Sequence, residues 1–167
     1  MAPNTAPNTD FIAAAKTNWE KHGWGDAASG MATLTSVVRV AQMMRTRCEQ
    51  TLAPFGISFA RYELLTLLHF TRHGALPMSK ISERLQVHPA SVTHTVARLE
   101  RDGLVRRGSS AEDKRVILVS ITDQGIALVK AATPELNAVF RNLGLTKDAQ
   151  EDLYQICSDF RRIAGDF

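Results

Sequence analysis

Hydrophobic residues recur at intervals of three and four along several segments of the chain, which is the pattern of amphipathic helices. The longest such run extends from Met31 to Leu52, and Pro54 and Gly56 follow it as helix-ending residues. A shorter amphipathic stretch, residues 11–24, comes before it. Three glycines are expected to separate the two helices, Gly23, Gly25 and Gly30.

A second helix is predicted directly after the first long one. Ser58 can cap its N-terminus, and the apolar residues of Phe59–Arg72 share one face. His73 and Gly74 are expected to end it. Ser79 can then start a further short helix, which carries two apolar residues on one side.

The following segment alternates helix and strand signals. His88 is expected to cap a helix from Pro89 to Asp102, with Gly103 in the position that ends helices. The stretches LVRR and RVILVSIT are β-branched and strand-like, and the polar turn GSSAEDK separates them. The order helix, turn, helix, strand, turn, strand predicts a helix-turn-helix with a two-stranded wing.

Two more helices are predicted beyond the wing. Thr122 or Asp123 can cap the first, which is expected to kink at Pro134 and to end at Gly144. The last helix is predicted over residues 147–164. Its apolar residues form one stripe, Leu153, Ile156, Cys157, Phe160 and Ile163.

The predicted fold is therefore mainly α with a small β-wing. We expect a loose tail over residues 1–10, N-terminal dimerisation helices over 11–57, a winged helix-turn-helix domain over 58–122 and C-terminal dimerisation helices over 123–167. Amphipathic helices at both ends of the chain have no obvious partner within one winged domain. A twofold homodimer would bury them, and packing within one chain is the alternative.

Charge is concentrated in the predicted winged domain. Residues 78–115 hold eight Lys and Arg against five Asp and Glu, whereas the rest of the 167 residues holds twelve of each sign. The formal net charge of +3 therefore lies in one stretch, as an anion-binding surface requires. No apolar run is long enough to span a bilayer, and the first residues lack the pattern of a signal peptide, so we expect a cytoplasmic protein.

The sequence shows no pattern typical of a catalytic site or a metal site. There is no nucleophile and base pair, no glycine-rich phosphate loop and no metal-ligand spacing, so we expect neither an enzyme nor a cofactor. The two cysteines, Cys48 and Cys157, are too few for a disulfide framework, and we expect both to be buried as small hydrophobes. Trp19 and Trp24 are expected to pack over the dimer core, or else to line a pocket.

The helix from Pro89 has two different faces. At 100° per residue, Val92, Val96 and Leu99 point toward a core. The opposite face is small, polar and basic, which lets a helix enter a major groove and offer hydrogen bonds to bases or phosphates. An ordinary surface helix is the alternative. The outward and flanking residues are Ala90, Ser91, Thr93, His94, Ala97, Arg98 and Arg101.

Several motifs resemble the MarR family of bacterial winged-helix transcription regulators. Asp113-Lys114-Arg115, the strand VILVSIT and Asp123-Gln124-Gly125 match the family's D-x-R wing signature and the LT-x-x-G motif that starts its next helix. SVTHTVARLERDGLVRR fits the family's recognition-helix segment, and the resemblance extends from about Leu34 to Leu153. It implies a dimeric regulator, most often a repressor, that binds a pseudo-palindromic operator in double-stranded DNA.

The resemblance also implies which residues meet DNA. Arg115 is expected to enter the minor groove from the wing tip, with Asp113 bracing the turn. The position that is often arginine in relatives is His94 here, so the usual base contact of the family is not assumed. The complete set expected at DNA is Ser79, Ala90, Ser91, Thr93, His94, Arg98, Arg101, Lys114 and Arg115.

Regulators of this family commonly respond to small molecules, typically phenolic or aromatic carboxylates. The candidate pocket residues here are Met43, Met44, Arg45, Cys48, Phe59, Tyr62, His69 and Arg72. Two alternatives stay open. One is a thiol-oxidation sensor acting through Cys48, and the other is a winged-helix protein-interaction module that does not bind DNA.

Overall fold

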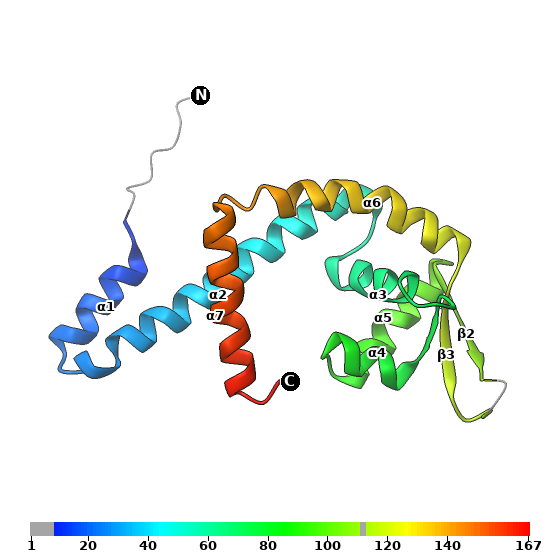
Figure 1. The fold of residues 1–167 in the computed structure, drawn as a ribbon, viewed down its shortest axis with the longest axis horizontal. Coiled ribbons are helices and arrows are strands. Elements are labelled where there is room, and N and C mark those ends of the chain that lie inside the picture. Colours follow the sequence, from blue (N-terminus) through cyan, green and yellow to red (C-terminus); the bar gives the residue numbers. More distant parts are fainter. Residues whose placement is uncertain (1–8, 111–112) are drawn as a thin grey trace. The chain divides into compact units, whose positions relative to one another are not determined.

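The computed structural model describes residues 9–110 and 113–167, and Figure 1 shows the course of the chain. The chain forms two compact units, Met1–Gln50 and Thr51–Phe167. The second is called the winged unit below. The expected tail lies almost entirely outside the described residues, and Glu112 of the wing turn lies outside them too.

The first unit contains helix α1 (Phe11–Lys21) and most of helix α2 (Gly25–Leu52). Asp10 caps α1 by accepting the backbone N–H groups of Ile12 and Ala13. The prediction that α2 begins at Met31 is wrong, because Gly30 lies inside the helix. A single glycine costs only about 1 kcal/mol relative to alanine, which a long helix tolerates.

Trp19 and Trp24 pack against each other at the turn between α1 and α2. Their ring centroids are 5.4 Å apart in an edge-to-face arrangement. Gly23 occupies this turn with a φ of 81°, which glycine adopts without strain. The two tryptophans therefore stabilise the turn that joins the helices.

The predicted stop of α2 and the start of the next helix are confirmed. A short 3₁₀ turn η1 (Ala53–Phe55) contains Pro54, and Gly56 adopts a φ of 67°. Ser58 caps α3 (Phe59–His69) by accepting the N–H of Arg61. The helix ends three residues earlier than predicted, because the Thr71 hydroxyl donates to the carbonyl of Leu68 and closes the last turn.

Helices α4 (Met78–Leu85) and α5 (Pro89–Arg101) form the helix-turn-helix. The predicted cap of α5 is confirmed, because Nδ1 of His88 accepts the N–H of Ala90 at 3.2 Å. The prediction that Ser79 starts α4 is wrong. The strand before α4 leads straight into the helix, so Pro77 takes the N-cap position and Ser79 lies in the first turn.

The winged unit contains one more strand than the sequence predicts. Strands β1 (Ala75–Pro77), β2 (Val105–Ser109) and β3 (Ile117–Ile121) form an antiparallel sheet in the order β1-β3-β2. In the wing, Val105 pairs with Ile121 and Ser109 with Ile117. β1 pairs with β3 on its other side, as an edge strand that tolerates a proline.

The core of the winged unit lies where α3, α5, α6 and the sheet meet. Helix α6 (Asp123–Arg141) is capped by Thr122, whose oxygen accepts the N–H of Gly125 and whose hydroxyl donates to the carbonyl of Gly103. The most completely buried side chains are Leu52, Leu64, Leu65, Leu68, Ile81, Val92, Val96, Leu99, Val105, Val119 and Leu136. This packing fixes the orientation of α5 and of the wing.

Helix α7 (Lys147–Ile163) differs from the other helices of the winged unit. None of its side chains, all of which the structure describes, is buried. The prediction that Cys157 is buried is therefore wrong, although Cys48 on α2 is buried as predicted. Within the described ranges, no helix combines the length and the apolar character needed to cross a membrane.

Candidate nucleic-acid interface

Helix α5 presents one apolar face to the core and one polar face to solvent. Val92, Val96 and Leu99 are each at most 2% exposed, as the helical rotation predicts. Every outward or flanking residue of the predicted set is exposed, namely Ala90, Ser91, Thr93, His94, Ala97, Arg98 and Arg101. The available face is therefore small, polar and basic.

Some polar side chains on this face already make contacts within the protein, whereas others do not. The Thr93 hydroxyl donates to the carbonyl of Pro89 at 3.0 Å, which leaves its oxygen as an acceptor. Nε of Arg101 lies 3.5 Å from Oδ1 of Asp102. Within the described residues, Arg98 makes no ion pair, so its guanidinium keeps all its donors for another partner.

Asp113 and Arg115 form a closed turn near the tip of the wing. Oδ1 of Asp113 accepts hydrogen bonds from the backbone N–H of Arg115 at 2.9 Å and from the Nε of the same residue at 3.2 Å. Oδ2 of Asp113 accepts a hydrogen bond from Nη2 of Arg115 at 3.4 Å. The backbone N–H and then the guanidinium lower the pKa of the Asp113 carboxyl below its ordinary value. The Arg115 side chain is nevertheless 90% exposed. Asp113 therefore holds the backbone and the guanidinium of Arg115, while the Arg115 side chain stays accessible to solvent.

Glu100 connects the last turn of α5 to the wing. Its Oε1 accepts a hydrogen bond from the backbone N–H of Arg107 at 3.0 Å. Its Oε2 lies 2.7 Å from Nε and 2.6 Å from Nη2 of the Arg107 guanidinium. The guanidinium and the backbone N–H lower the pKa of the Glu100 carboxyl. Since successive residues of a strand point to opposite sides, Arg106 is directed away from this contact and is exposed.

A second ion pair ties the end of α5 to α3. Arg61 donates through Nη2 to Oδ2 of Asp102, the C-cap residue of α5, and through Nη1 to the carbonyl of Gly56 at 3.3 Å. The Arg61 side chain is largely covered, at 14% exposure. Both ends of α5 are therefore held, by the His88 cap at the start and by this pair at the end.

These bracing residues were missed from the sequence. No sequence pattern indicates an ion pair for any of the four, Glu100, Arg107, Arg61 and Asp102, although Asp102 is expected at the end of the helix from Pro89. Glu100 and Arg107 are seven residues apart across a helix end and a strand, which no local spacing rule covers. Arg61 and Asp102 are separated by 41 positions, so only the fold brings them together.

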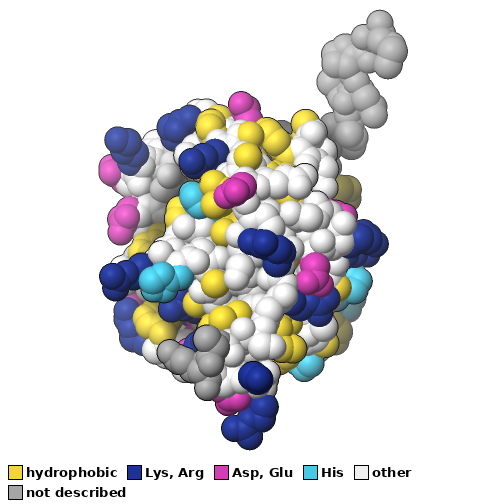
Figure 2. Space-filling view, turned by 90° about the vertical axis from the view of Figure 1, so that its right-hand side faces the viewer, with side chains coloured by type: hydrophobic (Ala, Val, Ile, Leu, Met, Phe, Trp, Pro, Cys, Tyr) yellow, Lys and Arg dark blue, Asp and Glu magenta, His cyan; other side chains and the backbone are white. Residues whose placement is uncertain are grey.

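The charged surface around the wing is mixed rather than uniformly basic. Figure 2 shows the end of the winged unit that carries β2 and β3, with Lys and Arg side chains spread among Asp and Glu side chains. Lys114 is exposed next to Arg115, and Ser79 is exposed in the first turn of α4. In this unit, Glu100 is paired with Arg107 and Asp113 with Arg115.

The predicted small-molecule residues fall in different parts of the chain. Met43, Met44, Arg45 and Cys48 lie on α2 in the first unit, and Phe59, Tyr62, His69 and Arg72 lie on or just after α3 in the winged unit. Tyr62 is buried, with its hydroxyl 2.8 Å from Oγ1 of Thr133. That contact gives Tyr62 a structural partner on α6.

Comparisons with known proteins agree with this architecture. A family model described as the MarR family matches residues 57–117, which include the helix-turn-helix and most of the wing. The organic hydroperoxide resistance transcriptional regulator of Bacillus subtilis (strain 168) is 33% identical over 115 residues. This alignment covers 69% of the chain and 75% of that protein. The chain belongs to the MarR family.

Solved structures of MarR family regulators share the fold. Sco5413, a MarR family transcriptional regulator from Streptomyces coelicolor, is 42% identical with a TM-score of 0.76, and the match covers 83% of this chain and 97% of that one. Sco3205 from the same organism, solved in complex with DNA, is 26% identical with a TM-score of 0.70, covering 82% and 86%. The protein is thus a MarR family transcriptional regulator rather than an enzyme.

Proposed function

We propose that this MarR family regulator acts as a homodimeric repressor that reads a pseudo-palindromic operator and is released by a small aromatic or phenolic ligand. The observation that carries the proposal is the polar face of α5. Val92, Val96 and Leu99 fix the rotation of the helix, and small, hydrogen-bonding and basic side chains remain outside. The relative Sco3205, which shares this fold, was solved with DNA.

In this proposal α5 lies in the major groove. The small side chain of Ala90 lets the helix start approach the base edges closely, and Ser91, Thr93 and His94 offer hydrogen bonds to them. Arg98 and Arg101 contact phosphates or guanine edges at the other end of the helix. Ser79, in the first turn of α4, contacts the backbone.

The wing supplies the second contact. Arg115 reaches the minor groove, where a planar guanidinium is favoured by the negative potential of a narrow groove, and Lys114 neutralises a neighbouring phosphate. Asp113 keeps the turn in one conformation, so that less rotational freedom is lost on binding. Glu100 holds the strand behind the wing through Arg107.

The dimer is supported by the uncovered apolar side chains of α7. Phe160 is 73% exposed and Ile156 66% exposed on a helix with a single apolar stripe. Exposed apolar stripes of this kind mark association surfaces. A twofold dimer would place two α5 helices about one DNA turn apart, roughly 34–36 Å between half-site centres.

Repression and release by ligand complete the proposal. A dimer that covers promoter DNA blocks access of polymerase, which makes repression the simplest outcome of binding. For the ligand we keep the candidate residues predicted from the sequence, because an arginine together with aromatic side chains and methionines would suit an aromatic carboxylate. Cys48 is buried, so an oxidant-accessible thiol is not supported there.

The test is fluorescence anisotropy of the full chain on duplexes from the DNA flanking its own gene and on random duplexes, over a salt series. We expect preferential binding that weakens steeply as salt rises. Arg115→Ala should weaken binding and lower the salt slope by about one, whereas Lys130→Ala on α6 should do neither. Equal affinity for all duplexes, or an unchanged Arg115→Ala variant, would contradict the proposal and favour a protein-interaction module.

A further inference from the structure

The residues that follow α7 fold back over its last turn. The backbone N–H of Gly165 donates to the carbonyl of Arg162 at 3.1 Å, and the N–H of Asp166 donates to the carbonyl of Arg161 at 2.9 Å. Gly165 has a φ of 75°, so these two bonds form a Schellman motif, a common way to end a helix. The motif fixes the backbone of Asp166 beside the end of α7.

The carboxylate of Asp166 connects this segment to the helix-turn-helix. Its Oδ2 accepts a hydrogen bond from Nε of Arg161 at 2.6 Å, and its Oδ1 accepts one from Nε2 of Gln86 at 2.7 Å. Gln86 is the C-cap residue of α4. Two donors, one on α7 and one after α4, therefore bind the two oxygens of a single carboxylate.

The turn that carries Gln86 is closed by backbone hydrogen bonds. The N–H of Gln86 donates to the carbonyl of Glu83 at 3.3 Å, and the N–H of Val87 donates to the carbonyl of Ser82 at 3.2 Å. Gln86 has a φ of 53° and is the only residue other than glycine with a positive φ among the described residues. Since α5 begins three residues later, at Pro89, the backbone of Gln86 is fixed next to the helix proposed to enter the major groove.

Both donors remain within reach of an anion from solvent. Gln86 is exposed, and the Arg161 side chain is 48% exposed. The Arg161 guanidinium lies 4.9 Å from the ring centroid of Phe167, a cation–π contact that helps to hold it in place. The hydrogen bond from Arg161, and after it the one from Gln86, lowers the pKa of the Asp166 carboxyl, so this group is an anion at neutral pH.

We propose that Arg161 and Gln86 form a binding site for one DNA phosphate, and that Asp166 occupies this site in the free protein. A carboxylate and a phosphodiester each present two oxygens that share a negative charge, so the same two donors suit both. Phosphates flank a helix that lies in the major groove, and Gln86 is next to the start of that helix. DNA has to displace Asp166, so this contact is autoinhibitory. The inference rests on the DNA binding proposed above.

The test is fluorescence anisotropy of the full chain on a duplex of the DNA flanking its own gene and on a random duplex of equal length. Asp166→Ala should raise the affinity for both duplexes about threefold to tenfold, because a phosphate contact does not depend on sequence. The salt slope should steepen by about one, since no displaced carboxylate takes up a cation. Asp159→Ala is the matched control, because it removes an acid of α7 that binds Arg162 instead, and it should leave both quantities unchanged.

Two further variants separate the site from a general effect of charge. Arg161→Gln, added to Asp166→Ala, should cancel the gain in affinity and the steeper slope. Gly165→Val keeps the carboxylate but disfavours the positive φ that places it, so it should raise the affinity as well. Circular dichroism checks that every variant is folded.

The outcomes distinguish this inference from the proposed function. If wild type binds DNA, the inference is overturned by an unchanged or lower affinity of Asp166→Ala, by an equal gain in Asp159→Ala, or by a gain that survives Arg161→Gln. A wild-type chain without salt-dependent binding to either duplex would overturn the proposed function and this inference together.

Discussion

The carboxylate of Glu100, in the last turn of α5, binds the backbone and the guanidinium of Arg107 on β2 with both of its oxygens. This contact joins the helix proposed to read the major groove to the strand that leads into the wing. The pKa of the Glu100 carboxyl is lowered as a result. One ionised side chain thus links the last turn of α5 to β2.

Glu100→Gln keeps the shape of the side chain but removes its charge, so we expect a lower melting temperature at pH 7 and weaker DNA binding. A lowered folded-state pKa stabilises the fold above the unfolded-state value, and this contribution is lost as pH falls through the folded-state pKa. The melting temperatures of wild type and variant should therefore converge as pH falls below the ordinary value of 4.5. Scanning calorimetry across pH measures this, with Glu151→Gln as control. A difference that persists unchanged at acidic pH would contradict the assignment.

Gly125 lies where the start of α6 approaches the chain after α5. A Cβ there would meet the carbonyl oxygen of Leu104 and lie 2.8 Å from Cγ1 of Ile121. We expect Gly125→Ala to destabilise the winged unit by about 1–3 kcal/mol, the usual cost of overpacking. Chemical denaturation measures it. A stability equal to that of wild type would show that the backbone can move apart there.

Gly30 lies inside α2, where, unlike at Gly125, there is room for a side chain. An added Cβ would meet no atom within 4 Å, and the backbone is helical. Gly30→Ala should therefore leave the fold intact and stabilise α2 by about 0.5–1 kcal/mol, because alanine loses less backbone freedom in a helix. Circular dichroism during thermal unfolding checks the direction. A loss of stability would mean that another surface covers this part of α2.

Tyr62 is a buried donor between α3 and α6. The Thr133 hydroxyl donates to the carbonyl of Val129 at 2.6 Å, so the Tyr62 hydroxyl donates to Oγ1 of Thr133 at 2.8 Å. Tyr62→Phe should cost about 1 kcal/mol, or roughly 2–4 °C in melting temperature, and leave DNA affinity unchanged. A large loss of DNA affinity or of ligand response with normal stability would instead assign Tyr62 to a binding site.

Phe160 is expected at the dimer interface. Phe160→Asp places a charge in the apolar stripe of α7, so we expect a monomer in sedimentation experiments and much weaker operator binding, because each half-site then binds alone. Gln155→Asp adds the same charge on the opposite side of α7 and should leave the dimer intact. A dimer in both variants would place the interface elsewhere.

The sequence predicts the helices around the DNA-facing elements closely, and for physical reasons. Val92, Val96 and Leu99 define the buried face of α5, while His88, Pro89 and Gly103 mark its ends. These signals depend only on residues that are close in the sequence, so the folded structure keeps the predicted helix start and buried face. The wing turn is similar, because Asp113 and Arg115 are only two residues apart.

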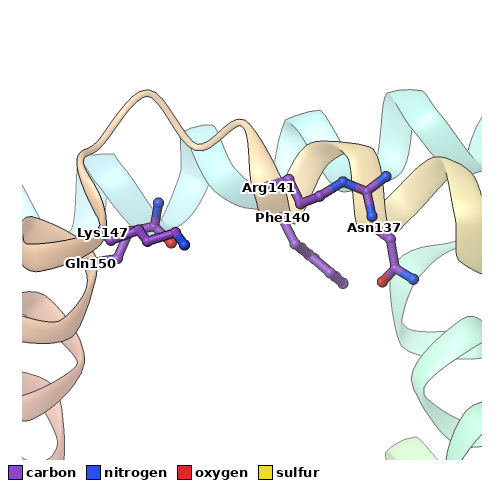
Figure 3. A pocket seen from close by; sticks show the side chains of 5 residues that line it. All are labelled: Asn137, Phe140, Arg141, Lys147 and Gln150. Atoms are coloured by element: carbon purple, nitrogen blue, oxygen red, sulfur yellow. The ribbon is translucent and has the colours of Figure 1, made fainter.

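The missed features depend on contacts between distant residues. β1 has three residues and includes Pro77, too few to show alternation, and it becomes a strand only by pairing with β3. The start of α2 at Gly25 was missed because Gly30 resembles a helix stop. The pocket lined by Phe140 and Arg141 of α6 and by Lys147 and Gln150 of α7 forms only when the turn after α6 brings the two helix ends together (Figure 3).

The central claim is that the exposed face of α5 reads base sequence. Selection of binding sites from a pool of randomised duplexes tests it most directly, with the wild-type chain, a Ser91→Ala/His94→Ala variant and Lys130→Ala as control. The account predicts that wild type and control enrich the same pseudo-palindrome with half-sites about one helical turn apart, and that the α5 variant changes the preferred bases within each half-site. No enriched sequence for wild type, or the same sequence for all three proteins, would contradict it.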